Sequence, residues 1–302
     1  IVPERFSLTA EQQICALCGK EQMLNIEVLS FKRLCNRVFR EYGGLCYNYA
    51  GGGVQMLIAY RALQRVKGEL KNYGSLQLKD LGTVSAIQKN LVDFKRAGLP
   101  FEQLLELSKS ESLKKRTKLC AKLYDHGVIG KEYDRLLALE YDDPEEDLTK
   151  LDALLARHPF FADREVFVDA TAAFSVQELK ILERVLEQGA PLTVALQMRQ
   201  NEKRPAFERI RYCKDALCRI AFDRNIAVRD LAECVHPPLK KAKDLLYLEA
   251  ALFGEEERPF KEAAEHLSLE VLFDPYEECK TIAARILKDV TENGGRFLDH
   301  GV

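Results

Sequence analysis

Two short polar segments, each directly after an apolar run, combine the side-chain types that bind unpaired nucleic acid. One segment follows Val2 and the other follows Leu29. Arginine and serine hold phosphate oxygens, whereas aromatic rings stack on exposed bases. The alternative is that Phe31 packs in the core and that the arginines lie on solvated helix faces. The candidate DNA-binding residues are Arg5, Ser7, Phe31 and Arg33.

A third apolar run, residues 165–169, ends in the carboxylate of Asp169. NTPases place an Asp at the end of such a strand to hold Mg²⁺. The groups needed beside it are missing, because the sequence has no G-x-x-x-x-G-K-[ST] motif and Ala170 stands where a helicase of this type carries a catalytic Glu. We therefore expect Asp169 to be the remnant of a nucleotide site. No residue of this chain is predicted to be catalytic.

Two charged patterns each have a structural and a functional interpretation. The acidic run at residues 142–147 could bind a divalent metal ion, but it precedes a predicted helix, whose N-terminus favours carboxylates. A loop that starts this helix is therefore the preferred interpretation. The lysine-rich stretches at residues 114–118 and 240–243 are expected to be solvated faces, with contact to a nucleic-acid backbone as the alternative.

The nine cysteines are spread from Cys15 to Cys279 in a sequence without a secretory signal. An odd number placed in this way argues against a disulfide framework. Cys15 and Cys18 could form a redox pair or half of a zinc site, but no second Cys or His pair follows at a usable spacing. They also lie in an amphipathic stretch, where cysteine acts as a small hydrophobic residue. We expect no metal site and no cofactor in this segment.

The composition limits the class of protein. Of the 302 residues, 47% are hydrophobic and 30% are charged, which excludes a disordered or collagen-like chain and favours about two domains. The net charge of −2 means that nucleic acid must bind at a local patch. No apolar run approaches the ~20 residues of a membrane span, and we expect a cytoplasmic protein. Because the sequence starts at Ile1 without Met, we also expect it to be cut from a longer one.

The periodicity of apolar residues alternates between two kinds. Strand patterns at residues 25–29, 165–169, 191–198 and 226–228 are separated by helical patterns, and the capping box Ser175-x-x-Glu178 begins one helix. Between residues 51 and 159 the period of 3.6 dominates. Helices are predicted there at 54–70, through Val84 and Phe94, and at 112–125, 131–141 and 147–157.

These patterns predict an α/β fold. Residues 1–50 and 160–235 form a parallel-sheet domain, which an all-helical insertion at 51–159 interrupts. Residues 236–302 are expected to be a connection and the start of a second α/β unit, because a strand pattern at 267–273 precedes an amphipathic helix.

Several stretches, in this order along the chain, resemble the AddB family, called RexB in some lineages. AddB is the B subunit of the bacterial ATP-dependent helicase–nuclease AddAB. The stretches that carry the resemblance are Val2–Leu8, Val28–Leu34, Gly53–Leu57, Val166–Leu179 and Gly294–Phe297.

The resemblance implies a RecA-like domain of the superfamily 1 helicase type that does not act as a motor. Such a subunit guides the unwound strand and recognises the Chi sequence, together with an AddA-like helicase–nuclease subunit, in the repair of double-strand breaks. The single-strand and Chi contacts of the family carry over to Arg5, Ser7, Phe31 and Arg33. Arg5 stands where the family more often has Gln.

The resemblance also implies that the P-loop of the family lies upstream of this sequence. The nuclease domain and the cysteines of its iron–sulfur cluster lie downstream. The ATP, Mg²⁺ and iron–sulfur cluster of the parent protein would therefore not be held here, and the segment is expected to be inactive alone. The alternative function is a scaffold that docks a partner motor subunit without direct DNA contact.

Overall fold

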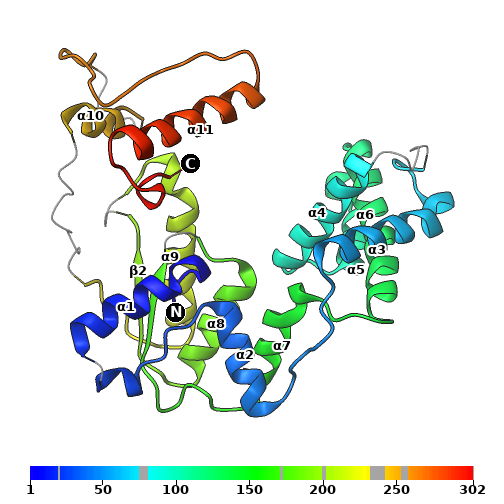
Figure 1. Cartoon of the computed structure of the whole chain (residues 1–302). Helices are drawn as coiled ribbons and strands as arrows, with labels where there is room; N and C mark the ends of the chain where they lie inside the picture. The colour runs from blue at the N-terminus through cyan, green and yellow to red at the C-terminus, as the bar shows by residue number, and fades with distance from the viewer. Residues whose placement is uncertain are drawn as a thin grey trace. The chain divides into compact units, whose positions relative to one another are not determined.

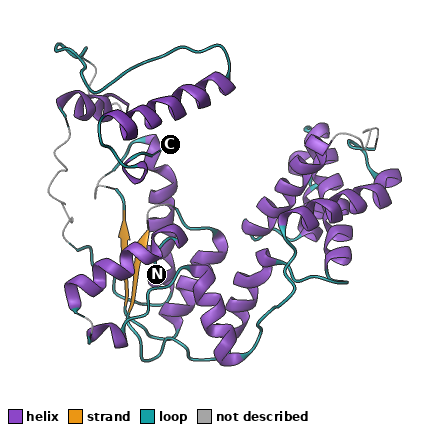
Figure 2. Ribbon diagram, viewed as in Figure 1, coloured by secondary structure: helices purple, strands orange, loops and turns teal. Residues whose placement is uncertain are grey.

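The computed structural model describes residues 1–19, 21–74, 81–170, 173–198, 202–231, 242–252 and 258–301 (Figure 1). The chain forms two compact units, Ile1–Glu233 and Cys234–Val302. The structure is mostly helical with a small parallel sheet (Figure 2), in agreement with the predicted α/β class. Among the described residues, no helix is both long and apolar enough to cross a membrane.

The sheet contains two parallel strands, β1 (Val166–Ala170) and β2 (Leu192–Leu196). Helix α8 (Val176–Glu187) makes the crossover between them, as parallel strands require. The predicted capping box is present, because the Ser175 hydroxyl oxygen accepts from the Glu178 amide at 3.2 Å and the Glu178 carboxylate accepts from the Ser175 amide at 2.7 Å. The strand predictions at residues 165–169 and 191–198 are both confirmed.

The first two residues extend this sheet on the side of β1 that is opposite β2. The Ile1 nitrogen donates to the Phe167 carbonyl, and the Asp169 amide donates to the Ile1 carbonyl at 3.0 Å. The Val2 amide in turn donates to the Leu29 carbonyl at 2.9 Å. The prediction of a regular strand at 25–29 is wrong, because this segment finds only a two-residue partner for its backbone groups.

One face of the sheet shares a core with three helices, α2 (Phe31–Tyr42), α7 (Asp147–Leu155) and α8. Val168 is buried in this core, whereas Phe167 on the other face is 57% exposed, as the alternation of side chains along a strand requires. The helical residues that fill the core are Leu34, Val38, Phe39, Leu151, Leu155, Ile181, Leu182 and Val185.

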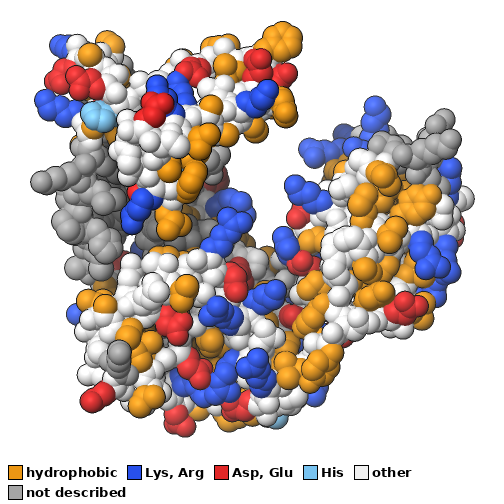
Figure 3. All heavy atoms as spheres, viewed as in Figure 1, with side chains coloured by type: hydrophobic (Ala, Val, Ile, Leu, Met, Phe, Trp, Pro, Cys, Tyr) orange, Lys and Arg blue, Asp and Glu red, His pale blue; other side chains and the backbone are white. Residues whose placement is uncertain are grey.

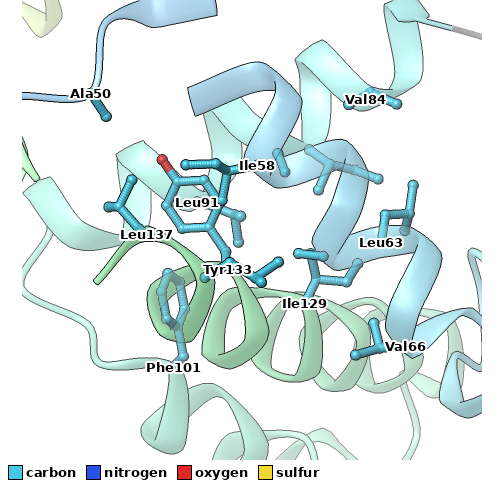
Figure 4. Close-up of a cluster of buried hydrophobic side chains, with 14 of the residues drawn as sticks. Ala50, Ile58, Leu63, Val66, Val84, Leu91, Phe101, Ile129, Tyr133 and Leu137 are labelled. Atoms are coloured by element: carbon cyan, nitrogen blue, oxygen red, sulfur yellow. The ribbon is translucent and has the colours of Figure 1, made fainter. Parts of the chain in front are cut away.

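The helical insertion has a core of its own. Its helices are α3 (Gly52–Val66), α4 (Leu81–Arg96), α5 (Phe101–Leu107) and α6 (Thr117–Leu137). Ile58, Leu91 and Tyr133 meet in this core from three of these helices (Figure 4). We call these four helices the helical block.

Helix α6 runs without a break through the region where the sequence predicts two helices, 112–125 and 131–141. Gly127 and Gly130 explain the difference, because they are the places where α5 packs against α6. A Cβ atom on Gly127 would lie 2.7 Å from the Leu105 side chain, and one on Gly130 would overlap the ring of Phe101. The two glycines permit close approach of two helices rather than ending one.

The chain leaves and rejoins the α/β part at neighbouring points. Tyr49 and Asp142 form a parallel β-bridge, in which the Asp142 amide donates to the Asn48 carbonyl at 2.9 Å. The Ala50 amide donates to the Asp142 carbonyl at 3.0 Å. The two ends of the helical block are therefore held side by side.

Two further strand predictions are wrong in the described part of the chain. Residues 226–228 form a loop after helix α9 (Glu208–Asp223), and residues 267–273 pair with no strand. The apolar side chains of the second segment remain in water, since Leu269, Val271 and Phe273 are each at least 92% exposed. In this second unit the predicted helix is present as α11 (Pro275–Glu292), and a shorter helix, α10 (Lys243–Leu252), precedes it.

Replacement of Gly130 by alanine should destabilise the protein although alanine is the better helix former. The new methyl group would overlap the Phe101 ring, and overpacking of this kind costs about 1–3 kcal/mol. Gly53→Ala in α3 is the matched control, because a Cβ there meets nothing within 4 Å. Urea unfolding should show a loss for Gly130→Ala and no loss for Gly53→Ala, and equal midpoints would contradict the packing described here.

Candidate nucleic-acid interface at the strand ends

Three segments come together at one edge of the sheet, each after a stretch whose backbone is hydrogen-bonded to its neighbour. They are residues 3–7 after Val2, residues 30–33 after Leu29, and residues 173–175, which follow β1 after the undescribed residues 171 and 172. The parallel backbone pairing makes this convergence necessary, because parallel strands end at the same edge of a sheet.

The carboxylate of Glu4 joins the first two segments. The Ser30 hydroxyl donates to Glu4 Oε2, and Arg33 Nε lies 3.8 Å from Glu4 Oε1. Ser30 is also the N-cap of α2, where its oxygen accepts from the Arg33 amide at 3.2 Å. Sequence reasoning missed Glu4, because a carboxylate is not a side chain expected to face phosphate.

Arg5 and Ser7 lie in different environments. Arg5 is exposed on the single turn Glu4–Phe6, and it makes no ion pair with another described residue. Ser7 begins helix α1 (Ser7–Cys18), is only 2% exposed, and donates its hydroxyl to the Glu4 carbonyl at 3.0 Å. The hydroxyl of Ser7 therefore fixes the turn that carries Arg5.

Phe31 serves both as a core residue and as a surface residue. Its ring is half-buried against the core that α2 shares with the sheet, and it meets the Phe174 ring edge to face, with centroids 6.4 Å apart. Phe174 is a second aromatic ring at this edge that the sequence analysis did not select. Its only signal was its place after a strand that ends in Asp169.

Asp169 is exposed, on the face of the sheet that the helices leave open. It points to the same side as the exposed Phe167, because the two residues alternate with the buried Val168. The described residues contain no group of three His, Cys, Asp or Glu side chains that could hold a metal ion. The interpretation of Asp169 as the remnant of a nucleotide site stays a prediction.

The acidic run at 142–147 joins the helical block to α7. Lys95 at the end of α4 is buried, with its Nζ 2.5 Å from both Asp134 Oδ1 and Asp143 Oδ2. Burial by itself lowers the pKa of Lys95, but the two carboxylates together raise it above its ordinary value. Since Asp147 is the first residue of α7, the predicted helix-start loop is confirmed for this run.

The described cysteines are free thiols, and none belongs to a metal-binding group. Cys15 and Cys18 lie in α1 and are half-buried and exposed, respectively. Burial raises the pKa of Cys35 to about 12, and the pKa of the Cys213 thiol is shifted in the same direction for the same reason.

Brief alkylation of the folded chain with iodoacetamide at pH 8 should label Cys18 and Cys279 first, because both are exposed. Cys35 should react roughly a thousandfold more slowly, since a thiol with a pKa of about 12 carries almost no thiolate at this pH. Peptide mass spectrometry would measure the labelling, with the urea-unfolded chain as the control in which all sites react. Early labelling of Cys35 in the folded chain would contradict its burial.

Comparison with known proteins identifies the family. The family model described as ADDB, N-terminal, matches residues 1–249. The chain is 28% identical over 306 residues to the B subunit of the ATP-dependent helicase/deoxyribonuclease of Thermoanaerobacter sp. (strain X514), covering 99% of this chain and 26% of that protein. It is 27% identical over 311 residues to the protein of the same name from Clostridium acetobutylicum, covering 100% of this chain and 26% of that protein.

The chain spans about a quarter of the length of these two relatives. Within the chain, however, the family model covers most residues, including the three segments at the strand ends. The chain therefore belongs to the family of AddB N-terminal regions.

Proposed function

We propose that this chain is the non-motor, RecA-like part of the B subunit of an ATP-dependent DNA helicase/deoxyribonuclease, which acts in double-strand break repair in the bacterial cytoplasm. Within that larger protein it binds single-stranded DNA and recognises Chi. The observation that supports this most directly is that the segments carrying Arg5, Phe31 and Arg33 are joined at one edge of the sheet through Glu4 and Ser30. Open α/β sheets bind their ligands at this edge.

The side chains at the edge suit the two parts of an unpaired strand. The half-buried ring of Phe31, supported from the side by Phe174, provides a surface on which a base stacks. Arg5 and Arg33 provide charge for phosphates. Among the described residues, Arg33 is paired only with the exposed carboxylate of Glu4. An exposed pair is worth about 0–1 kcal/mol, so exchange of Glu4 for a phosphate oxygen costs little free energy.

We assign ATP hydrolysis in the parent complex to an AddA-like partner subunit. This chain has Ala170 where a motor of this type needs a catalytic Glu. The names of the relatives describe one subunit of an ATP-dependent enzyme, which supports a complex with such a partner.

Single-strand binding should weaken when the stacking ring or either arginine is removed. Phe31→Leu keeps apolar volume but removes the aromatic face, and we expect a loss of at least about fivefold in affinity, since stacking is worth about 1–3 kcal/mol per base. Arg5→Ala and Arg33→Ala should each lower the affinity about threefold to tenfold and reduce its salt dependence. Fluorescence anisotropy with a labelled oligo-dT strand measures all three.

Arg40→Ala is the matched control, because Arg40 lies on the same helix as Arg33, is exposed, and makes no ion pair with a described residue. It removes the same charge two turns away from the edge. If Phe31→Leu and Arg33→Ala bind as tightly as Arg40→Ala does, the strand does not cross this edge.

A second candidate function is docking of the partner motor subunit on the helical block. Exposed apolar side chains favour this alternative, because Leu57 and Leu81 on the block and Leu139 just after α6 are each more than 60% exposed. Figure 3 shows further hydrophobic side chains on the surface of this block. In this case the chain is a scaffold and needs no direct DNA contact.

The docking alternative predicts that co-purification with an AddA-like subunit is lost when residues 51–139 are replaced by a short Gly-Ser linker. A short linker suffices because Ala50 and Asp142 are joined by a hydrogen bond. The deletion spares α7, which belongs to the core of the sheet. Circular dichroism would verify that the remainder is folded, and retention of the partner by the deleted chain would exclude the block as the docking surface.

A further inference from the structure

The end of the helical block where α6 begins is strongly basic. Residues 108–122 contain six Lys or Arg side chains and one carboxylate, Glu111, although the whole chain carries a net charge of −2. Figure 3 shows Lys and Arg side chains gathered at the upper end of this block. The basic residues of this segment are Lys109, Lys114, Lys115, Arg116, Lys118 and Lys122.

Most of this charge is available to a ligand. The side chains of Lys109, Lys115, Arg116 and Lys118 are exposed and make no ion pair with another described residue. Lys114 is paired with Glu111, but both side chains are more than 70% exposed, so that the pair is weak. A cluster of unpaired like charges is costly unless an anion neutralises it.

The backbone that carries these charges is fixed. Arg116 donates its amide to the Leu113 carbonyl at 2.7 Å, and the Cys120 thiol donates to the same carbonyl at 3.2 Å. These bonds hold the short turn before α6 against the first turns of the helix.

A second segment adds Lys71 to the same place. The buried carboxylate of Asp125 on α6 accepts hydrogen bonds from three successive amides, those of Lys71, Asn72 and Tyr73, at 2.7, 2.7 and 2.8 Å. The Lys71 ammonium then lies 3.8 Å from the centroid of the Tyr124 ring. Its position is therefore set by a buried, fully bonded carboxylate rather than by a surface ion pair.

Three of these lysines, Lys71, Lys109 and Lys114, line a hollow of about 270 Å³. Among the described residues, its lining is dominated by lysines and hydroxyl side chains, with Cys120 and Ala121 as the apolar members. Lysine and serine or threonine hydroxyls are the groups that contact phosphate oxygens. The polar residues of the lining are Lys71, Ser108, Lys109, Ser110, Glu111, Lys114 and Thr117.

The geometry points to a second DNA contact, and we propose that this basic end of the helical block binds the phosphate backbone of duplex DNA. The described lining supplies ammonium and hydroxyl groups rather than the aromatic faces that unpaired bases need, and the Tyr124 ring beside it is covered by Lys71, so the contact is to the backbone alone. A protein partner would need an apolar centre in its interface, and the described lining offers only the small side chains of Cys120 and Ala121 for it. The inference extends the proposed function, because it places duplex and single strand on different surfaces of the same protein.

Three substitutions test the proposal in the full 302-residue chain. Lys109→Gln, Lys115→Gln and Lys118→Gln together remove three exposed charges without touching the bonds of the turn. Binding of a labelled duplex of about 20 base pairs is measured by anisotropy between about 50 and 200 mM salt. We expect about a tenfold loss of affinity near 100 mM salt and a salt slope lower by about 2–3, since each phosphate contact contributes about 0.9 to that slope.

The matched control removes the same net charge from exposed residues elsewhere in the first unit, through Arg61→Gln, Lys89→Gln and Arg157→Gln. An equal loss in both triple variants would overturn the proposal, because it would reflect net charge only. Absence of duplex binding by the unsubstituted chain would overturn it as well. Unchanged duplex binding with lost capture of an acidic protein partner would assign the surface to that partner instead.

The single-strand site is tested separately in the same experiment. The triple lysine variant should bind oligo-dT as the unsubstituted chain does, whereas Phe31→Leu should bind the duplex normally. Failure of the single-strand proposal would leave the duplex result unaffected, and failure of the duplex proposal would leave the oligo-dT result unaffected.

Discussion

The backbone hydrogen bonds of Ile1 and Val2, which join β1 on one side to Leu29 on the other, determine how the candidate site is built. Ile1 is bonded to Phe167 and Asp169 on one side, and Val2 is bonded to Leu29 on the other. Since Ile1 pairs with β1 in the parallel sense and Val2 is bonded to Leu29, the loops that follow these segments leave the sheet at one edge. The proximity of Glu4, Ser30 and Phe174 follows from this arrangement rather than from any attraction between the loops themselves.

The distribution of charge agrees with the division of the first unit into a sheet part and a helical block. Carboxylates and lysines at the join neutralise each other, as in the buried contact of Lys95 with Asp134 and Asp143. At the far end of the block, positive charges are left without partners among the described residues. A nearly neutral chain can therefore present a strong local field, because opposite charges neutralise each other where the two parts meet.

Local signals in the sequence predicted the elements that need no distant partner. The capping box of Ser175 and Glu178 and the apolar run at 165–169 are complete within a few residues, and both are present in the structure. Residues 267–273 have an equally good strand pattern but pair with no strand in the described part of the chain, which the pattern alone cannot reveal. The role of Gly130 depends on Phe101 across the helix interface, and the role of Glu4 depends on Ser30, so single-segment reasoning could not find either.

The β-bridge between Tyr49 and Asp142 has a consequence for how this family can change over time. Because the bridge joins the two ends of the helical block, the distance that the block must span between Tyr49 and Asp142 stays the same whatever helices lie between them. Helices can be lengthened, shortened or exchanged there without moving α2 or α7, and selection can act on the block as a separable module. The sheet edge and the block can then acquire different ligands at different rates within one protein.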